Sequence, residues 1–456
     1  MAVWVLFLAY ALIRLAVEPF TSVVGAVAIA TAALLPAFLW TGGGVPGLPI
    51  VPIHTVAFVW THALPVIAGG LEVGAYDADE IMFASFCMVI YCVLATIVWI
   101  LIANRAVKVR ASYYVLASDW GFTFFIVAIG IGGFLVAAMV NGWIYFAMDP
   151  GIFGLLRSSV LAFASIGMFL LSLRLARGEM HLLQRVAFLT VAAFFLIAQI
   201  TTLYLIGAMI SLASAAIGYT IGRGRVPWAA MAAALLFFGF LHAGKGDMRD
   251  NYWANDAPTL TLSEVPTFFA DWIAAGTRES TTSDDEAGSS PISERLDLMH
   301  LLLLVQRRSP DAVPYLGGET YRFIPGLLIP RIFDADKPPS NLGTSILSVR
   351  YGVQSQEDTE STSVAWGLTN EAYANFGLAG MAGLGVLIGL LFGFFGRLTA
   401  GVPVMSVESM AGVTVAALAI QSEFTMGVFI TVLFQSLVVL LLLVPFLDKR
   451  PSGEPG

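Results

Sequence analysis

The chain of 456 residues is 58% hydrophobic and only 12% charged, and its formal net charge is −8. A soluble domain carries about a quarter charged residues, so this composition predicts a helical membrane protein with many spans. The acidic balance argues against nucleic acid as a partner, because nucleic-acid binding needs a basic stripe. The two cysteines, Cys87 and Cys92, lie in one apolar run. They are too few for a disulfide framework or a four-ligand metal site, and we expect no metal and no cofactor.

Apolar runs follow one another through the first 243 residues. Most are close to the roughly 20 residues that cross the hydrocarbon core of a bilayer. They cover about Ala2–Val17, Ser22–Trp40, Met82–Ala103, Gly121–Val140, Ile152–Leu173 and Pro227–Ala243. The segment Ile50–Gly70 is also apolar, but Pro52 and Pro65 interrupt it. It fits either a poor transmembrane helix or an interfacial hairpin, and we favour the hairpin.

Basic residues predict which ends of these runs face the cytoplasm. They cluster at residues 104–110, at 174–185, at 223–225 and in the C-terminal tail. The apolar run Val186–Ile221 has a basic cluster at each end, so it must cross the membrane an even number of times. Its length fits two short helices with the outer turn near Gln199–Tyr204. The next run then leads outward, which places Gly244–Asn375 outside the membrane.

Three further spans are expected after this external loop, at Phe376–Gly396, about Met410–Gln421 and Met426–Leu447. Gly385, Gly389 and Gly393 recur every fourth residue in the first of these spans, which predicts close helix packing through a face of small residues. The count is eleven spans with an external N-terminus. It becomes twelve with a cytoplasmic N-terminus if Ile50–Gly70 crosses.

The predicted fold is therefore an all-α polytopic membrane protein with one large external loop. Residues 1–243 form an N-terminal transmembrane bundle, and 244–375 form the loop, with a mobile acidic tip at 277–291. Residues 376–447 form the C-terminal transmembrane helices, and 448–456 form a cytoplasmic tail. Within the loop, Glu294–Val305 fits an amphipathic helix with Ser293 as its N-cap. Tyr315–Asp334 mixes aromatic residues with Gly and Pro, and fits a hairpin or re-entrant element.

The loop contains 19 of the 31 acidic residues but only 10 of the 23 basic ones. Its second half nevertheless gathers basic residues that suit a lipid-linked phosphate or diphosphate, namely Arg295, Arg307, Arg308, Arg322, Arg331, Lys337 and Arg350. The alternative is ion pairing with the loop's own acids and with lipid headgroups. Arg157, Lys245 and Arg249 add cations that map to the outer face, against the inside bias of positive charge. His242, His300 and Glu371 are the candidates for proton transfer, and Glu371 is the best placed, where the loop returns to the membrane.

In chain order, several short motifs resemble those of the Wzy-type O-antigen and exopolysaccharide repeat-unit polymerases. They are Arg295, Gly317-Gly318-Glu319-Thr320-Tyr321, Ile329-Pro330-Arg331, Asp336-Lys337-Pro338 and Glu371-Ala372-Tyr373-Ala374-Asn375-Phe376-Gly377. The resemblance implies a metal-independent glycosyltransferase of the bacterial inner membrane with its large loop in the periplasm. Such enzymes join oligosaccharide units that are linked to undecaprenyl diphosphate. A chain-length regulator and a flippase would be further partners.

The resemblance also implies roles for single residues. Arg295 and Arg331 would bind the diphosphate and stabilise its charge as it leaves, and Lys337 would support them. Glu371 would orient the acceptor hydroxyl or take its proton. The remaining candidates for binding the lipid diphosphate or the glycan are Arg322, Arg249, Lys245, Arg157, His300 and Tyr321.

Two other functions are compatible with this layout. An O-antigen ligase uses similar helices and a similar loop but passes the glycan to a lipid A core. The run from Gly-Glu-Thr-Tyr to Asp-Lys-Pro favours the polymerase. A flippase or transporter of lipid-linked sugars would need ionisable residues at mid-membrane depth and paired repeats, and we find the spans nearly uncharged.

Overall fold

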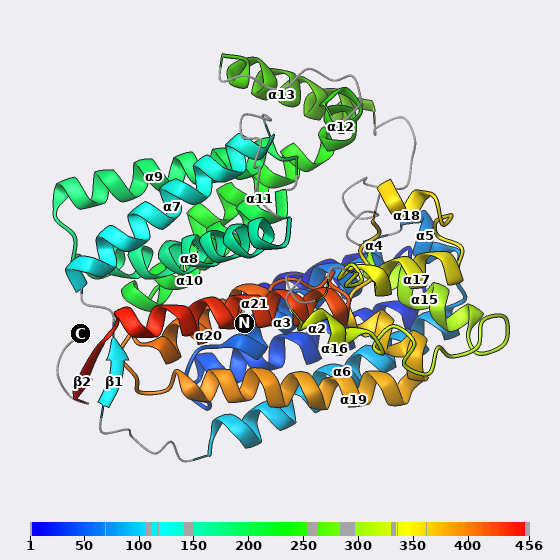
Figure 1. The fold of residues 1–456 in the computed structure, drawn as a ribbon. Helices are drawn as coiled ribbons and strands as arrows, with labels where there is room; N and C mark the ends of the chain where they lie inside the picture. The colour runs from blue at the N-terminus through cyan, green and yellow to red at the C-terminus, as the bar shows by residue number, and fades with distance from the viewer. Residues whose placement is uncertain are drawn as a thin grey trace. The chain divides into compact units, whose positions relative to one another are not determined.

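A computed structural model describes the chain except for residues 1, 69, 106–111, 116–117, 141–149, 204, 253–262, 283–296, 330–333, 335, 362 and 452–456. The described residues are mostly helical, with one two-stranded sheet (Figure 1). By length and composition, seven of the described helices could cross a membrane, at Phe20–Thr41, Ile50–Ala68, Ala78–Ala103, Gly121–Ala138, Ser159–Arg177, Leu182–Thr201 and Leu368–Leu398. Four shorter helices are also apolar, at Ala2–Arg14, Trp228–Ala243, Val407–Ala419 and Met426–Leu442. The predicted all-α membrane class is confirmed, whereas the number of spans stays a prediction.

The helices form two compact units. Unit 1 comprises Met1–Val109, Gly288–Val402 and Leu418–Phe434, and unit 2 comprises Arg110–Ala287, Pro403–Ala417 and Gln435–Gly456. Residues 244–287 of the predicted loop therefore belong to unit 2, and 288–375 belong to unit 1. The division into membrane and external segments describes the chain relative to a bilayer, and it stays a prediction.

Unit 1 is built on two long helices, α6 (Ala78–Ala103) and α19 (Leu368–Leu398). Its other elements are α1 (Ala2–Arg14), α2 (Phe20–Thr41), α3 (Ile50–Val56), η1 (Val59–Ala63), α4 (Leu64–Ala68), α5 (Leu71–Gly74), α15 (Leu298–Arg308), α16 (Ile324–Leu327), α17 (Leu342–Arg350) and α18 (Asp358–Ser361). An ideal Cβ added at Gly385 or Gly389 of α19 would lie 2.7 Å from a backbone carbonyl oxygen of α6. The predicted close packing of α19 through its glycines is confirmed.

The interfacial hairpin favoured for Ile50–Gly70 is wrong. Residues 50–68 form one candidate span that is helical except for a turn at Ala57, because α3 is followed by a π-helical turn, η1, and then by α4. Pro52 falls in the first turn, where its missing N–H costs nothing. Pro65 would disturb the α-helical ladder, but the widened turn before it shifts the bonding, and Leu64 donates to the carbonyl of Val59. The π turn lets two prolines stand in one helix.

Unit 2 contains β1 (Ser112–Val115), α7 (Ser118–Val140), α8 (Pro150–Arg177), α9 (Leu182–Thr201), α10 (Leu205–Arg223), α11 (Trp228–Ala243), α12 (Lys245–Tyr252), α13 (Val265–Thr282), η2 (Val444–Phe446) and β2 (Asp448–Pro451). α20 (Val407–Ala419) and α21 (Met426–Leu443) are each divided between the units. The α9–α10 turn follows Thr201 and confirms the two helices predicted within Val186–Ile221. β1 and β2 pair antiparallel, with Ser112 opposite Pro451.

Two details of the predicted loop differ from expectation. The amphipathic helix begins at Leu298, and its N-cap is Asp297, whose carboxylate accepts from the N–H of His300 at 2.8 Å. Ser293 is therefore not the cap of this helix. The expected acidic tip starts as regular structure, since Thr277–Thr282 are the end of α13, and the rest of it lies outside the described residues.

Candidate functional site

Helix α19 is broken near its start, and the break separates Glu371 from the long apolar part. Phe376 (φ −141°, ψ 16°) and Gly377 (φ 59°, ψ −146°) are not helical. The positive φ suits glycine, and an added Cβ at Gly377 would lie only 2.8 Å from the hydroxyl of Tyr315. Residues 368–375 before the break are all buried. The expected boundary between loop and span, at Asn375–Phe376, coincides with this break.

The turn that starts the Gly317–Tyr321 motif is held against this buried segment by backbone hydrogen bonds. The N–H of Leu316 donates to the carbonyl of Ala374 at 3.0 Å, and the N–H of Gly317 donates to the carbonyl of Asn375 at 3.1 Å. Gly317 and Gly318 both have positive φ, at 58° and 92°. Two stretches about 55 residues apart in sequence thus form one local structure.

The side chain of Asn375 completes this connection. Its Oδ1 accepts from the N–H of Gly318 at 3.0 Å, and its Nδ2 donates to the Thr320 hydroxyl at 2.8 Å. The same Nδ2 donates to the backbone carbonyl of Glu371 at 2.8 Å. Thr320 and Asn375 are both fully buried. The amide therefore fixes Thr320 relative to the helix turn that carries Glu371.

Glu371 is completely buried, at 0% exposure. Its Oε2 accepts from the N–H of Met426, the first residue of α21, at 2.5 Å. A helix N-terminus attracts negative charge, so this oxygen serves as a cap for α21. The Thr320 hydroxyl lies beside the carboxylate. Oε1, however, has no partner with hydrogen-bond geometry among the described residues, and it faces Gly343 of α17, where an added Cβ would lie 3.3 Å away. Oε2 therefore has a structural role, and Oε1 is buried against Gly343.

Tyr321 lies beside this carboxylate and packs against the residue at the helix break. Its ring is tilted against that of Phe376, with 6.2 Å between the ring centroids. Burial, and secondarily the negative charge of Glu371, raise the pKa of Tyr321 above its ordinary range. The phenol therefore stays protonated at neutral pH and can act as a hydrogen-bond donor to a substrate, not as a base.

Several cations expected to bind phosphate are engaged within the fold. Lys337 donates to the carbonyls of Leu327 and Ile329, the second at 2.8 Å. The other contacts are those of Arg307 with both carboxylate oxygens of Glu80, of Arg308 with the carbonyl of Tyr351, and of Arg350 with Glu319 at 3.2 Å. Only the Arg350–Glu319 pair is the ion pairing with the loop's own acids that the alternative describes, since Glu80 lies outside the loop and Lys337 and Arg308 contact backbone carbonyls. Arg322 is exposed.

The remaining candidates are divided between the two units. His300 belongs to unit 1, where its ring meets Tyr76 edge-on at 5.8 Å. Lys245 and Arg249 lie on α12 of unit 2, and Nη2 of Arg249 donates to the carbonyl of Leu203 at 3.4 Å, which ties α12 to the α9–α10 turn. Arg157 is a residue of α8, also in unit 2. Arg295 and Arg331 lie outside the described residues.

Thr320 and Asn375 belong to the sequence motifs, but they are not among the site residues predicted from the sequence. One signal was present: Glu371 and Asn375 are four residues apart, which places both side chains on one face of a helix. No sequence pattern pointed to Gly343 or to the N–H of Met426, because both reach the site through tertiary packing.

No protein-family model, no curated protein and no solved structure matches this chain. The resemblance to the Wzy-type polymerases stays a prediction that rests on the short motifs quoted above.

Proposed function

We propose that this protein is a glycosyltransferase that polymerises oligosaccharide units linked to undecaprenyl diphosphate. It would act on the periplasmic face of the bacterial inner membrane, with its C-terminus in the cytoplasm. One observation carries the proposal: the Gly317–Tyr321 and Glu371–Gly377 motifs, distant in sequence, meet around a buried carboxylate whose Oε1 faces Gly343. A carboxylate with one oxygen fixed by Met426 and the other without a hydrogen bond of standard geometry is suited to orient a hydroxyl nucleophile that reaches it.

The reaction would follow from this geometry together with the cations of the loop. The acceptor hydroxyl oxygen bonds to the anomeric carbon of the donor glycan, and the bond from that carbon to the diphosphate oxygen breaks. The hydroxyl proton passes to Glu371, and the lipid diphosphate leaves with the bonding electron pair. Arg295 and Arg331 would stabilise the charge on this leaving group, and each well-placed donor is worth about 3 kcal/mol of barrier. Tyr321 would donate a hydrogen bond to the bound sugar.

The test is a gel of lipid-linked and surface polysaccharide from a strain that lacks this protein. Single repeat units that accumulate without long chains support the polymerase. Long chains that remain on their lipid carrier indicate the ligase instead, and loss of all external material indicates a flippase. An unchanged profile contradicts the proposal.

Complementation of the same strain tests the leaving-group role. Arg295→Ala and Arg331→Ala should insert normally but fail to restore long chains. Arg225→Ala is the matched control, since Arg225 is exposed after the end of α10, at the face expected to be cytoplasmic. Near-normal chain length in both loop variants would remove the diphosphate role from these arginines.

A further inference from the structure

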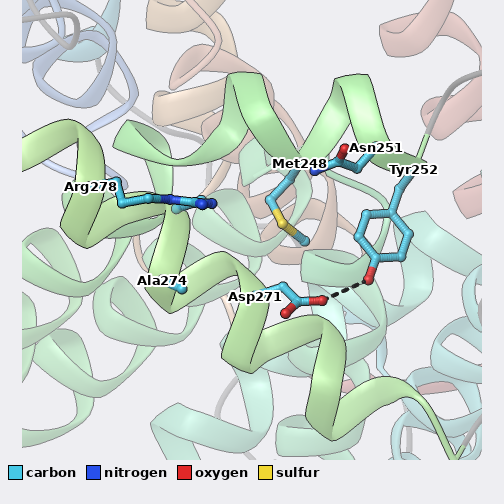
Figure 2. Close-up of a pocket in the computed structure, with 7 residues that line it drawn as sticks. Met248, Asn251, Tyr252, Asp271, Ala274 and Arg278 are labelled. Carbon is cyan, nitrogen blue, oxygen red and sulfur yellow. Dashed lines mark hydrogen bonds between the residues drawn. The ribbon is translucent and has the colours of Figure 1, made fainter.

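Helices α12 and α13 of unit 2 form a pocket that the proposed reaction does not use (Figure 2). Its volume is about 420 Å³, within the range of about 300–1,000 Å³ that small-molecule sites occupy. Its polar lining consists of Asn251, Tyr252, Asp271 and Arg278. Met248, Ala274 and Ala275 supply its apolar surface.

Helical spacing produces this mixture of polar and apolar groups. On α13, Asp271, Ala274 and Arg278 recur at intervals of three and four residues, so they share one face. The neighbouring positions Phe268 and Trp272 are buried in the core of unit 2. The indole N–H of Trp272 donates to the carbonyl of Leu241 at 2.7 Å, which fixes α13 against the end of α11. The pocket therefore rests on an ordered base.

The charges around the pocket disfavour an anionic ligand. Arg278 forms an exposed ion pair with Asp247, with 3.8 Å between Nη2 and Oδ2. Asp247 lies outside the lining, whereas Asp271 contributes a carboxylate to it. Counted over both helices (Lys245, Asp247, Arg249, Asp250, Asp271, Arg278 and Glu279), the charges sum to −1, so the pocket offers an anion no net attraction. A neutral ligand that both donates and accepts hydrogen bonds fits better.

The polar groups are arranged so that such a ligand can displace a weak internal contact. The hydroxyl of Tyr252 donates to Oδ2 of Asp271 at 3.3 Å, as the dashed line in Figure 2 marks. This distance exceeds the 2.5–3.0 Å typical of O–H···O bonds, so the contact exchanges readily for a ligand hydroxyl. The carboxylate of Asp271 and the side-chain amide of Asn251 can bind adjacent hydroxyls of a sugar. The Tyr252 ring and Met248 offer an apolar surface to the carbon face of a sugar.

We propose that this pocket binds a neutral sugar segment of an oligosaccharide. The choice of a neutral sugar follows from the residues that line the pocket, whereas the source of the saccharide rests on the proposed function. The pocket residues belong to α12 and α13 of unit 2 and Glu371 belongs to unit 1, so the residues that bind this sugar segment differ from those of the proposed reaction. Contacts with remote parts of a substrate supply binding energy that positions the reacting centre.

The experiment uses the full-length protein in detergent and measures binding of neutral oligosaccharides. These are released from the polysaccharide of the wild-type strain that produces the protein. Saturation-transfer NMR and calorimetry give the contact and the affinity. Asp271→Asn keeps the side-chain size but removes the charge, and we expect it to weaken binding about tenfold or more. Tyr252→Ala should weaken binding similarly. The matched control is Asp311→Asn, the same chemical change at an exposed turn of unit 1.

Unchanged affinity in both pocket variants, or no binding by the wild type, overturns the inference. Tighter binding of inorganic diphosphate than of the sugars, lost in the pocket variants, also overturns it. The thermal unfolding temperature of each variant distinguishes lost binding from lost folding. Binding is measured without turnover, so failure of the polymerase proposal in the gel assay would leave this result standing.

Discussion

Glu371→Gln separates the chemical role of this side chain from its structural role. The amide has nearly the same shape, and its oxygen can still accept from the N–H of Met426, the bond that caps α21. What it loses is the negative charge and the ability to take a proton. We therefore expect a folded protein that does not form long chains.

Glu371→Gln changes the free energy of unfolding through two effects of opposite sign. A hydrogen bond to a charged acceptor contributes about 1.5–3 kcal/mol and a neutral one about 1, so the variant loses about 1 kcal/mol at Met426. The wild type, however, buries a carboxylate at 0% exposure whose Oε1 has no hydrogen-bond partner among the described residues. The neutral amide avoids the burial of a charge, but its Nε2 takes the place of Oε1 and needs an acceptor there, so the gain is limited to about 1 kcal/mol. The unfolding free energy should stay about the same, whereas loss of a general base lowers the rate about 10²–10⁴-fold.

The assay combines chain length on the gel with thermal unfolding of the purified protein. Glu319→Gln is the matched control, because Glu319 belongs to the same local structure but pairs with Arg350. Glu371→Ala should also lower the unfolding temperature, since the N–H of Met426 would lose its acceptor. Normal chains from Glu371→Gln would refute the catalytic role. A Glu371→Gln protein that unfolds as easily as Glu371→Ala would mean that the charge serves only the fold.

Gly389→Ala should lower the thermal unfolding temperature, because its Cβ would lie 2.7 Å from a carbonyl oxygen of α6 and overpacking costs about 1–3 kcal/mol. Gly383→Ala, on the same helix with nothing within 4 Å, should leave it unchanged or raise it. Asn375→Ala should cost about 1–3 kcal/mol in denaturation, since it leaves buried polar groups without partners, and should shorten the polymer; full activity would remove its positioning role. The coupling energy between Arg307 and Glu80, measured in a double-mutant cycle with Arg307→Ala and Glu80→Gln, should not exceed about 1 kcal/mol, because the ion pair is partly exposed. A larger coupling energy would contradict this reasoning.

Helix positions could be predicted where hydrophobicity and charge act together. Basic residues at both ends of Val186–Ile221 required an even number of helices, and the structure places α9 and α10 there. The glycines of α19 indicated close packing because a missing side chain has few other uses on a membrane helix. The prediction of an interfacial hairpin at Ile50–Gly70 is wrong for a physical reason. The disruption caused by Pro65 is relieved by a π turn, which depends on packing and leaves no local signature.

The cations show what residue counts alone do not reveal. Sequence predicts that a net-acidic loop contains basic residues, but not which acceptors those residues contact. Lys337 holds two carbonyls of its own loop, and Arg307 and Arg350 hold carboxylates. Each contact fixes a segment of unit 1 and satisfies the cation that makes it. An arginine paired with a carboxylate has its charge partly compensated, so it attracts a diphosphate less strongly than an unpaired one would.

The burial of Glu371 constrains how any substrate could reach it. Its Oε1 packs against Gly343 in the first turn of α17, where a methyl group on that glycine would lie 3.3 Å from the oxygen. The Cε2 of Phe323 and the backbone of Ser340 pack closely against Gly427 of α21. An acceptor hydroxyl that contacts Oε1 must therefore displace α17 or the turn that contains Thr320. The same displacement would admit the hydroxyl and expose the carboxylate, so catalysis by Glu371 requires an opening motion of these segments.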